Sequence, residues 1–157
     1  LGDVYKRQMQ CSSKNQEETA MAGIKELIRT EEDNTLSFGN YDLPTKGKVS
    51  DYVFDGDVYK VKTFHDITRL EKNETFAYES TPGTVVTDYK ETEDTLSFIV
   101  NGFQDTQIIV AVEDDTEYQV SVDDAVIENY ETNLSGKIVI SLELEPGCVK
   151  KVQICKK

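Results

Sequence analysis

The second half of the sequence is a series of short segments rich in β-branched and aromatic residues, with Gly, Asp or Asn between them. Such residues fit the pleated, half-buried surface of a strand, and short strands at regular spacing are typical of a β-sandwich or barrel. The sequence therefore predicts a mainly β, antiparallel fold. The candidate strands in this half are residues 84–89, 95–100, 107–112, 118–122, 126–131, 137–144 and 151–155.

Turn signals connect several candidate strands. Asp55-Gly56 lies between two β-rich runs, and Asp-Gly tolerates the positive φ of a tight hairpin turn. Residues 118–133 predict a second hairpin about Asp123-Asp124. In residues 137–144 apolar side chains alternate with others, so this strand should present one apolar face. The Lys-rich ending, residues 150–157, predicts an edge strand protected by its charge.

The N-terminal part, residues 21–73, predicts a smaller β-rich segment that begins with one short helix. Ile24, Leu27 and Ile28 recur at the spacing of one helical face, which places the helix over residues 22–30. A helix this short is marginal alone, so we expect it to plug an end of the sheet structure; a partner-binding helix is the alternative. Residues 65–72 predict one or two further helical turns.

Residues 1–8 resemble a translated sequencing adapter, because DVYKRQ can be encoded by a transposon end used to prepare sequencing libraries. Gln16-Glu17-Glu18 can encode a ribosome-binding sequence, so residues 9–20 predict an untranslated leader and Met21 the start of translation. The alternative is that Cys11 is the mature N-terminus of a lipid-anchored extracellular protein.

Acidic residues dominate the charge: 30 Asp and Glu oppose 17 Lys and Arg, for a net charge of −13. Nucleic-acid binding needs clustered basic residues, and an acidic surface repels polyanions in general. No apolar run approaches the roughly 20 residues of a membrane span, and no secretory signal follows Met21. We therefore expect a soluble cytoplasmic protein with no nucleic-acid partner.

Cys148 and Cys155 flank a strand-like run, which would hold them about 23 Å apart and beyond the reach of a mutual disulfide. They have no Cys-x-x-Cys spacing and no histidine partner. Both are predicted to be reduced thiols in a reducing compartment.

His65 is the only histidine, and Asp66 beside it could orient a general base. Neighbouring residues on a helix do not face each other, so a surface histidine is favoured. The acidic groups at 55–57, 113–115 and 123–124 could bind calcium or act on glycosides. Each lies at a predicted turn, where Asp caps its own backbone, so turn chemistry is favoured. The sequence predicts no catalytic, cofactor-binding or metal-binding residue.

Tyrosines are numerous in a sequence that has no tryptophan. Exposed aromatic rings stack against sugars in carbohydrate-binding modules, whereas tyrosines in sandwiches pack with the hydroxyl at the rim. Core packing is favoured, and sugar binding is the alternative. The residues concerned are Tyr41, Tyr52, Tyr59, Tyr78, Tyr89, Tyr118 and Tyr130.

Two resemblances extend these expectations. Residues 118–126 (YQVSVDDAV), 131–144 (ETNLSGKIVISLEL) and 150–154 (KKVQI) resemble the last strands of immunoglobulin-like β-sandwiches found in many bacterial carbohydrate-active enzymes. Residues 21–157 also resemble a small, largely uncharacterised bacterial family that shares MAGIKELIRTE, TLSFGNY, GDVYKVKTF, ITRLEKN, FAYESTPGT, EYQV and TNLSGK. Its members often carry the name endosialidase, which implies hydrolysis of polysialic acid.

The expected organisation is a non-native leader over 1–20, a short helix with a small β-rich segment over 21–73, and an immunoglobulin-like antiparallel β-sandwich over 74–157. The leading functional hypothesis is a non-enzymatic, soluble, acidic protein that acts through an unknown protein partner or through self-assembly. The alternative is an extracellular carbohydrate-binding β-sandwich module. A polysialic-acid hydrolase comes third.

Overall fold

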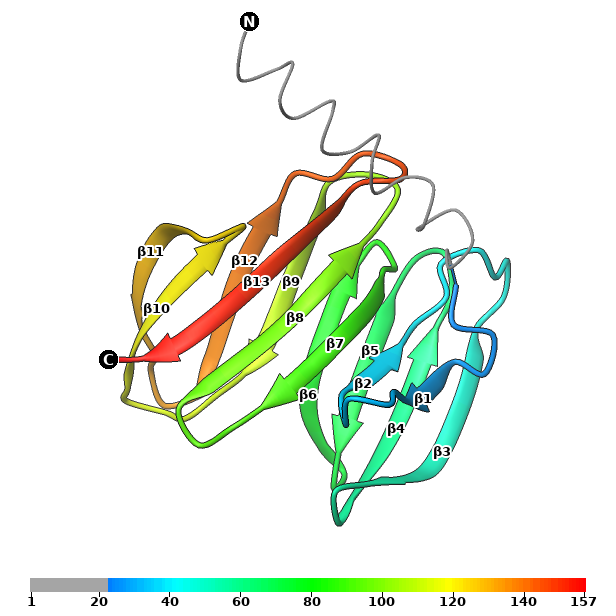
Figure 1. The fold of residues 1–157 in the computed structure, drawn as a ribbon, viewed down its shortest axis with the longest axis horizontal. Helices are drawn as coiled ribbons and strands as arrows, with labels where there is room; N and C mark the ends of the chain where they lie inside the picture. The colour runs from blue at the N-terminus through cyan, green and yellow to red at the C-terminus, as the bar shows by residue number, and fades with distance from the viewer. Residues whose placement is uncertain (1–22) are drawn as a thin grey trace, which may run out of the picture.

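Residues 23–157 are described by the computed structural model, and they form two antiparallel β-sheets with no helix among them (Figure 1). The seven-stranded sheet has the order β1-β2-β7-β8-β13-β10-β11, and the six-stranded sheet has the order β12-β9-β6-β5-β4-β3. The mainly β, antiparallel fold is therefore confirmed. The strands are β1 Ile28–Thr30, β2 Leu36–Phe38, β3 Gly47–Phe54, β4 Asp57–Thr63, β5 Thr68–Lys72, β6 Thr75–Thr81, β7 Val85–Glu91, β8 Thr95–Asn101, β9 Thr106–Ala111, β10 Glu117–Val122, β11 Ala125–Glu131, β12 Lys137–Leu142 and β13 Val149–Lys156.

Hydrophobic alternation explains why these segments form strands. In β12 the side chains of Ile138, Ile140 and Leu142 are buried, and the residues between them are exposed. The predicted apolar face of this strand is therefore confirmed, and it packs into the hydrophobic core between the two sheets. All the strands predicted in the second half of the chain form, as β7 to β13. The result is a sandwich-like arrangement with one hydrophobic core.

Four aromatic rings join the two sheets at the centre of this core. Phe38 of β2 meets Tyr78 of β6 and Tyr89 of β7 edge to face, with ring centroids 5.4 Å apart in each pair. Tyr78 also meets Phe98 of β8 edge to face at 5.5 Å. Edge-to-face contacts place the positive ring edge against the negative ring face and stabilise each pair beyond its burial. Tyr78 belongs to the six-stranded sheet, whereas Phe38, Tyr89 and Phe98 belong to the seven-stranded sheet. The contacts of Tyr78 with Phe38 and Phe98 therefore join the two sheets.

A buried hydroxyl cluster sits beside these rings. Thr84, in the connection between β6 and β7, places its hydroxyl 2.8 Å from the hydroxyl of Tyr78 and 2.7 Å from that of Ser80. All three residues are fully buried. Burial raises the pKa of Tyr78 above its ordinary value, so its hydroxyl stays neutral. The cluster satisfies the polar atoms that these residues bring into the core.

A chain of donors continues from this cluster toward β2. The Thr68 hydroxyl donates to the carbonyl oxygen of Thr84 at 2.8 Å, and it accepts from the amide of the same residue at 3.0 Å. The Thr63 hydroxyl lies 2.8 Å from that of Thr68 and accepts from the amide of Asn40 at 2.9 Å. Because Thr68 uses its proton on Thr84, Thr63 must donate to Thr68. The chain ties β4 and β5 to the loops that lead from β2 and into β7.

The helix predicted over residues 22–30 is wrong for the part of it that the structure describes. Residues 25–26 form a turn, and Ile28–Thr30 is strand β1. The amide of Ile24 donates to the carbonyl of Gly39, and Ile28 is paired with Phe38. Both isoleucines are buried, so the chain gains core packing and strand pairing that a helix of two turns could not match.

The helical turns predicted over residues 65–72 are also wrong, since Thr68–Lys72 is strand β5. Thr68 and Leu70 are fully buried and Arg69 between them is not, which is the period of a strand. The short segment contained too few apolar residues for its period to be read from sequence.

The Lys-rich ending is not an edge strand, so that prediction is wrong. β13 lies between β8 and β10 in the seven-stranded sheet and pairs with both. Its buried residues Val152 and Ile154 face the core, while Lys151 and Gln153 face outward. Lysines at the two ends of a central strand give the same pattern as lysines on an edge strand.

The division of the chain expected at residues 73 and 74 falls in the turn between β5 and β6. Strands on either side of this position pair with one another, β5 with β6 and β2 with β7. The leader expected over residues 1–20 lies outside the described residues.

Substitutions at Gly39 and Gly56 test how closely the backbone at position 39 packs against the carbonyl oxygen of Thr84. Both have positive φ, +100° and +80°, but only Gly39 would bring an added Cβ within 2.3 Å of the Thr84 carbonyl oxygen. Gly56→Ala should lower the free energy of unfolding by about 1 kcal/mol through backbone strain, and Gly39→Ala by roughly 3 kcal/mol because of the clash. Urea denaturation measures both, and equal losses would contradict the assigned packing.

Tyr78→Phe should lower the free energy of unfolding by about 1–2 kcal/mol, because Thr84 loses a buried hydrogen-bond partner. Tyr52→Phe is the control, since the Tyr52 hydroxyl meets Thr30 at 2.9 Å in an exposed contact. That variant should change stability by less than about 0.5 kcal/mol. Equal effects in urea denaturation would show that the buried hydroxyl cluster adds nothing beyond a surface hydrogen bond.

Candidate functional site

Strand β11 is an open edge of the seven-stranded sheet, and we call its residues, Ala125–Glu131, the open edge. It pairs with β10 on one side and with no strand on the other among the described residues, as the left margin of Figure 1 shows. An unpaired strand presents a row of free N–H and C=O groups that can pair with another chain. The open edge is therefore a candidate binding site.

The turn that creates the open edge is fixed by its two aspartates. Asp123 and Asp124 both have positive φ, 50° and 68°, as a two-residue hairpin turn requires. The Asp123 carboxylate accepts a hydrogen bond from the amide of Lys151 at 2.9 Å and lies 3.7 Å from the Lys150 ammonium. The hairpin predicted about this pair is confirmed, and the Asp123 carboxylate links its turn to β13.

Apolar side chains on and next to the open edge are exposed. Val126 is 56% exposed and Ile127 is 51% exposed. In the turn that follows, Leu134 is 83% exposed, and Val139 on β12 is 36% exposed. These are four of the six large apolar side chains exposed within residues 23–157. Scattered apolar residues on a surface need no explanation, but Val126 and Ile127 are neighbours on a strand that has no partner on its outer side.

The open edge is also acidic. Glu128 and Glu131 are both exposed, and neither has an ion-pair partner within residues 23–157. Glu131 lies directly opposite Glu117 on β10, so two like charges face each other across the pair. Such a pair is destabilising, and a cation beside it would relieve the repulsion.

The other three edge strands, β1, β3 and β12, have features that discourage pairing with another chain. β1 has three residues, and its Thr30 hydroxyl bonds the Tyr52 hydroxyl of β3 at 2.9 Å, so these two edges close on each other. β3 also has an irregular register near Asp51, whose φ is positive. β12 carries Lys137, whose ammonium lies 4.8 Å from the Phe76 ring centre. The open edge has a bulge at Ile127 but no lysine or proline.

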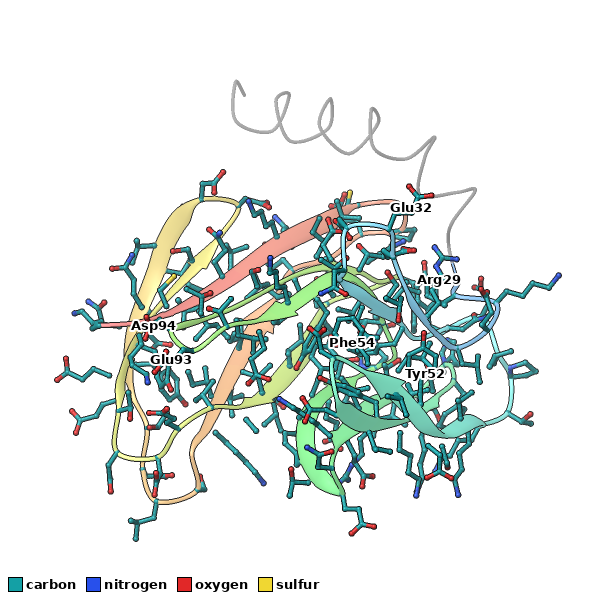
Figure 2. The ribbon with its side chains drawn as sticks, turned by 60° about the horizontal axis from the view of Figure 1, so that its bottom comes forward. Arg29, Glu32, Tyr52, Phe54, Glu93 and Asp94 are labelled. Atoms are coloured by element: carbon teal, nitrogen blue, oxygen red, sulfur yellow. The ribbon has the colours of Figure 1, made fainter. Side chains whose placement is uncertain are left out.

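A second candidate is a cleft of about 430 Å³ between the sheets, lined in part by Lys72, Phe76, Glu91 and Glu113. Glu93 and Asp94, in the turn between β7 and β8, lie at its rim, away from Arg29 and Glu32 on the β1 side (Figure 2). Its lining mixes acidic, basic and apolar side chains, so its chemistry depends on how the charges are paired.

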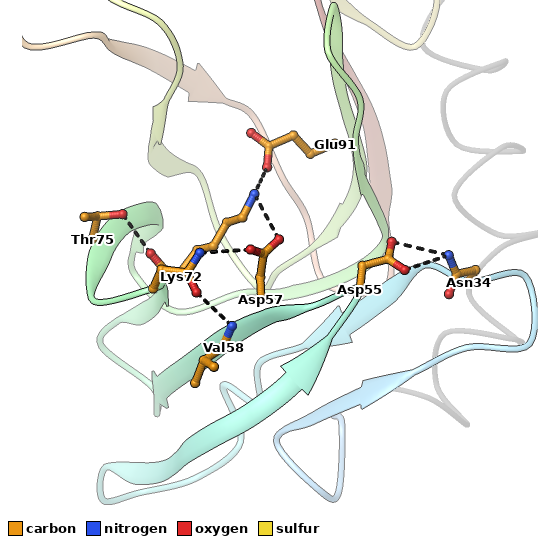
Figure 3. A network of polar contacts seen from close by, with 8 residues as sticks. Asn34, Asp55, Asp57, Val58, Lys72, Thr75 and Glu91 are labelled. Carbon is orange, nitrogen blue, oxygen red and sulfur yellow. Dashed lines mark hydrogen bonds and ion pairs between the residues drawn. The ribbon is translucent and has the colours of Figure 1, made fainter.

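Lys72 is held by carboxylates at this cleft. Its ammonium lies 2.8 Å from Glu91 on the facing sheet and 3.6 Å from Asp57 (Figure 3). Burial disfavours the charged lysine, but the hydrogen bond and charge of Glu91 outweigh this, and the pKa of Lys72 is raised. A hydrogen bond from Asn73 lowers the pKa of Asp57. At neutral pH the lysine is therefore protonated and paired, which prevents it from acting as a nucleophile or base.

The acidic residues singled out in the sequence at 55–57 and 113–115 lie at turns of the chain. Asp55-Gly56 forms the predicted hairpin turn, with φ of 51° and 80°. Asp115 also has positive φ, 46°, and its amide donates to the carbonyl of Asn133. Within residues 23–157 no group of three or more His, Cys, Asp or Glu residues is placed to hold a metal ion.

His65 is on the surface, as predicted, with a side chain that is 59% exposed. Its Nδ1 lies 3.0 Å from the Asp66 carboxylate, so the two neighbours do face each other, which a helix would have prevented. The ring stacks on Phe103 with centroids 4.5 Å apart, and Tyr41 meets the same Phe103 at 5.2 Å. Sequence reasoning missed this aromatic group because Phe103 lies far from both partners in the chain.

Tyrosine burial follows the favoured interpretation for most of these residues. Tyr59, Tyr78, Tyr89 and Tyr118 are at most 4% exposed. The Tyr118 hydroxyl accepts a hydrogen bond from the amide of Glu113 at 2.9 Å, which places it at the rim. The remaining three, Tyr41, Tyr52 and Tyr130, are partly exposed.

Cys148 and Cys155 differ in their covalent state. Cys155 is a free thiol, as predicted, whereas Cys148 is disulfide-bonded, so the predicted reduced thiol there is wrong. The spacing of Cys148 and Cys155 excluded only a bond between these two residues.

The two arginines of the described residues lie on different sheets. Arg29 on β1 pairs with Glu31, and Arg69 on β5 pairs with Glu79. They do not form the cluster that would clasp a sugar carboxylate.

Comparison with known proteins adds no relative: no protein-family model matches the chain, and no curated protein or solved structure matches it significantly. Within the described residues no helix is long and apolar enough to cross a membrane.

Lys72→Met should lower the free energy of unfolding by about 0.5–1 kcal/mol, because Glu91 and Asp57 lose their shared cation. Lys62→Met on neighbouring β4 is the matched control, since that lysine has no ion pair among the described residues. Urea denaturation in low salt measures both losses, and high salt should shrink only the first. Equal losses with no salt dependence would contradict the ion-pair assignment.

Proposed function

We propose that this chain acts without catalysis, by binding another protein through the open edge. The observation that carries the proposal is the combination of a free strand edge, exposed Val126 and Ile127, and a regular pairing over Glu128 to Glu131 that leaves the outer backbone groups of this strand open. Addition of a strand to an exposed sheet edge is a common mode of peptide recognition, in which backbone hydrogen bonds supply affinity.

The strand order supports an immunoglobulin-like module as the framework of this function. In immunoglobulin-like domains strands A, B and E lie side by side, and strands G, F, C and C′ form the facing sheet. The order β6-β9-β12 corresponds to A-B-E, and β8-β13-β10-β11 corresponds to G-F-C-C′. β8 departs from this scheme, because it comes before β9 to β13 in the sequence whereas strand G comes last. In this correspondence the open edge is strand C′, at the margin of its sheet.

The Lys72 cleft supports catalysis less well than the open edge supports binding. Its lysine is paired with two carboxylates, and the tyrosines beside that lysine, Tyr59 and Tyr89, are buried. Burial raises the pKa of both tyrosines, so neither phenol ionises readily. Catalysis usually requires a group poised to exchange a proton near neutral pH, and these groups are held away from that range.

Photo-crosslinking in cells of the source organism tests the proposed function. A photoreactive residue in place of Ile127 should capture one defined protein. The same residue in place of Val53, which is 67% exposed on the distant edge strand β3, should not. Mass spectrometry identifies the adducts. Absence of an adduct at Ile127, or the same adducts from both positions, would contradict the proposal.

Carbohydrate binding is a second candidate, favoured by the surface group of Tyr41, His65 and Phe103. Partly exposed rings can stack against the apolar faces of sugars. A glycan array probed with the protein should then show binding that Phe103→Ala abolishes and that Tyr52→Ala leaves unchanged. No binding to any neutral glycan would remove this candidate.

A further inference from the structure

We infer that the segment bound at the open edge is a basic, extended stretch of a different protein, added beside β11 as a further strand. This inference rests on the proposed function and adds the chemical class of the partner. Four observations on β11 support it: its regular pairing, the position of its acidic side chains, the repulsion expected between two copies, and the exposed apolar residues at its start.

The C-terminal half of β11 is a regular strand. Glu128 to Glu131 pair in register with Val120 to Glu117 of β10, beyond the bulge at Ile127. In a regular antiparallel pair, alternate residues direct their backbone groups away from the partner strand. A new strand placed about 4.8 Å farther out can therefore pair with β11.

Acidic side chains lie on both faces of this regular part. Glu128 is opposite Val120, which is buried in the core, so Glu128 points to the core side of the sheet. Glu131 is opposite Glu117 and lies three residues from Glu128, so it points to the other face of the sheet. An added strand with basic residues on both faces would place a cation beside each carboxylate. Beside Glu131, the cation would also offset the repulsion from Glu117.

A second copy of the chain fits this edge poorly. If two β11 strands paired antiparallel over their whole length, Glu128 of one copy would face Glu128 of the other. In parallel register, Glu131 would also lie beside its counterpart. Like charges directly opposite each other destabilise a strand pair, and each chain has a net charge of −13. The charge pattern therefore favours a basic partner over self-pairing.

The apolar end of the strand defines the rest of the partner. Val126 and Ile127 are half-exposed at the start of β11. A bound segment with aliphatic residues between its basic ones would cover them and remove apolar surface from water. The expected ligand is thus an extended segment with two Lys or Arg residues three positions apart, one on each face, and Val, Ile or Leu at the positions beside Val126 and Ile127.

A blocked peptide equal in length to β11, with two Lys three positions apart and Val at the other positions, tests the inference and is called the Lys-Val peptide. It should shift the backbone amide signals of β11 in NMR spectra of the labelled protein and slow their hydrogen exchange. A peptide with Glu in place of Lys should not bind. A peptide N-methylated at each Val keeps its charge but loses backbone donors, and it should bind much more weakly.

Charge variants separate the open edge from general attraction to an acidic protein. Glu128→Gln with Glu131→Gln should weaken binding of the Lys-Val peptide roughly fivefold, from two cross-strand charge pairs. Glu32→Gln with Asp42→Asn changes the net charge equally at exposed residues away from β11, and it should weaken binding less than about twofold. Equal weakening by both double variants would overturn the inference.

Several results would overturn the inference while leaving the proposed function standing. These are failure of the Lys-Val peptide to bind, equal binding of the Glu-Val or N-methylated peptide, and signal changes outside β11. A dimer of the unmodified protein that joins through β11, detected by sedimentation and by Ile127 crosslinks between copies, would replace the basic partner with a second copy. Failure of the proposed function itself is recognised separately, by the absence of an Ile127 adduct in cells.

Discussion

The buried chain of hydroxyl groups that ends at Thr84 is the constraint on which the rest of the structure depends. Thr63, Thr68 and Thr84 have no exposed surface, so every polar atom that they bring into the core needs a partner. The hydrogen bonds that supply these partners fix where β4 and β5 meet the start of β7. They also require a glycine at position 39, where any side chain would meet the Thr84 carbonyl.

The edge strands on the two sides of the molecule differ in how exposed they are. On one side β1 and β3 face each other across the sheets and share the contact between Thr30 and Tyr52. On the other side β11 and β12 lie at the ends of their sheets, with exposed apolar side chains along them. A free edge is a liability for a soluble protein, and the acidic residues of β11 limit which strands can use it. The same carboxylates can therefore exclude unwanted pairing and select a basic partner.

Sequence reasoning succeeded where a pattern is local. The alternation in β12 and the turn residues Asp55-Gly56 and Asp123-Asp124 report on neighbouring residues only, and each was predicted correctly. It failed for Ile24 and Ile28, because their apolar spacing fits a helix but their burial depends on contacts with β2, which the sequence does not reveal. The placement of β13 failed for the same reason. The open edge could be listed as a strand in advance, but its position at the margin is a property of strand order.

The central position of β13 has a consequence for how the chain is made. β8 and β10 become neighbours only through residues 149–156, so neither has its partner on that side until those residues leave the ribosome. Until then, the growing chain carries two more unpaired edges than the finished protein. Sheets closed by contacts distant in sequence fold slowly and expose aggregation-prone edges on the way. Completion of the seven-stranded sheet therefore has to wait for translation of β13, and until then the edges of β8 and β10 stay open to other chains.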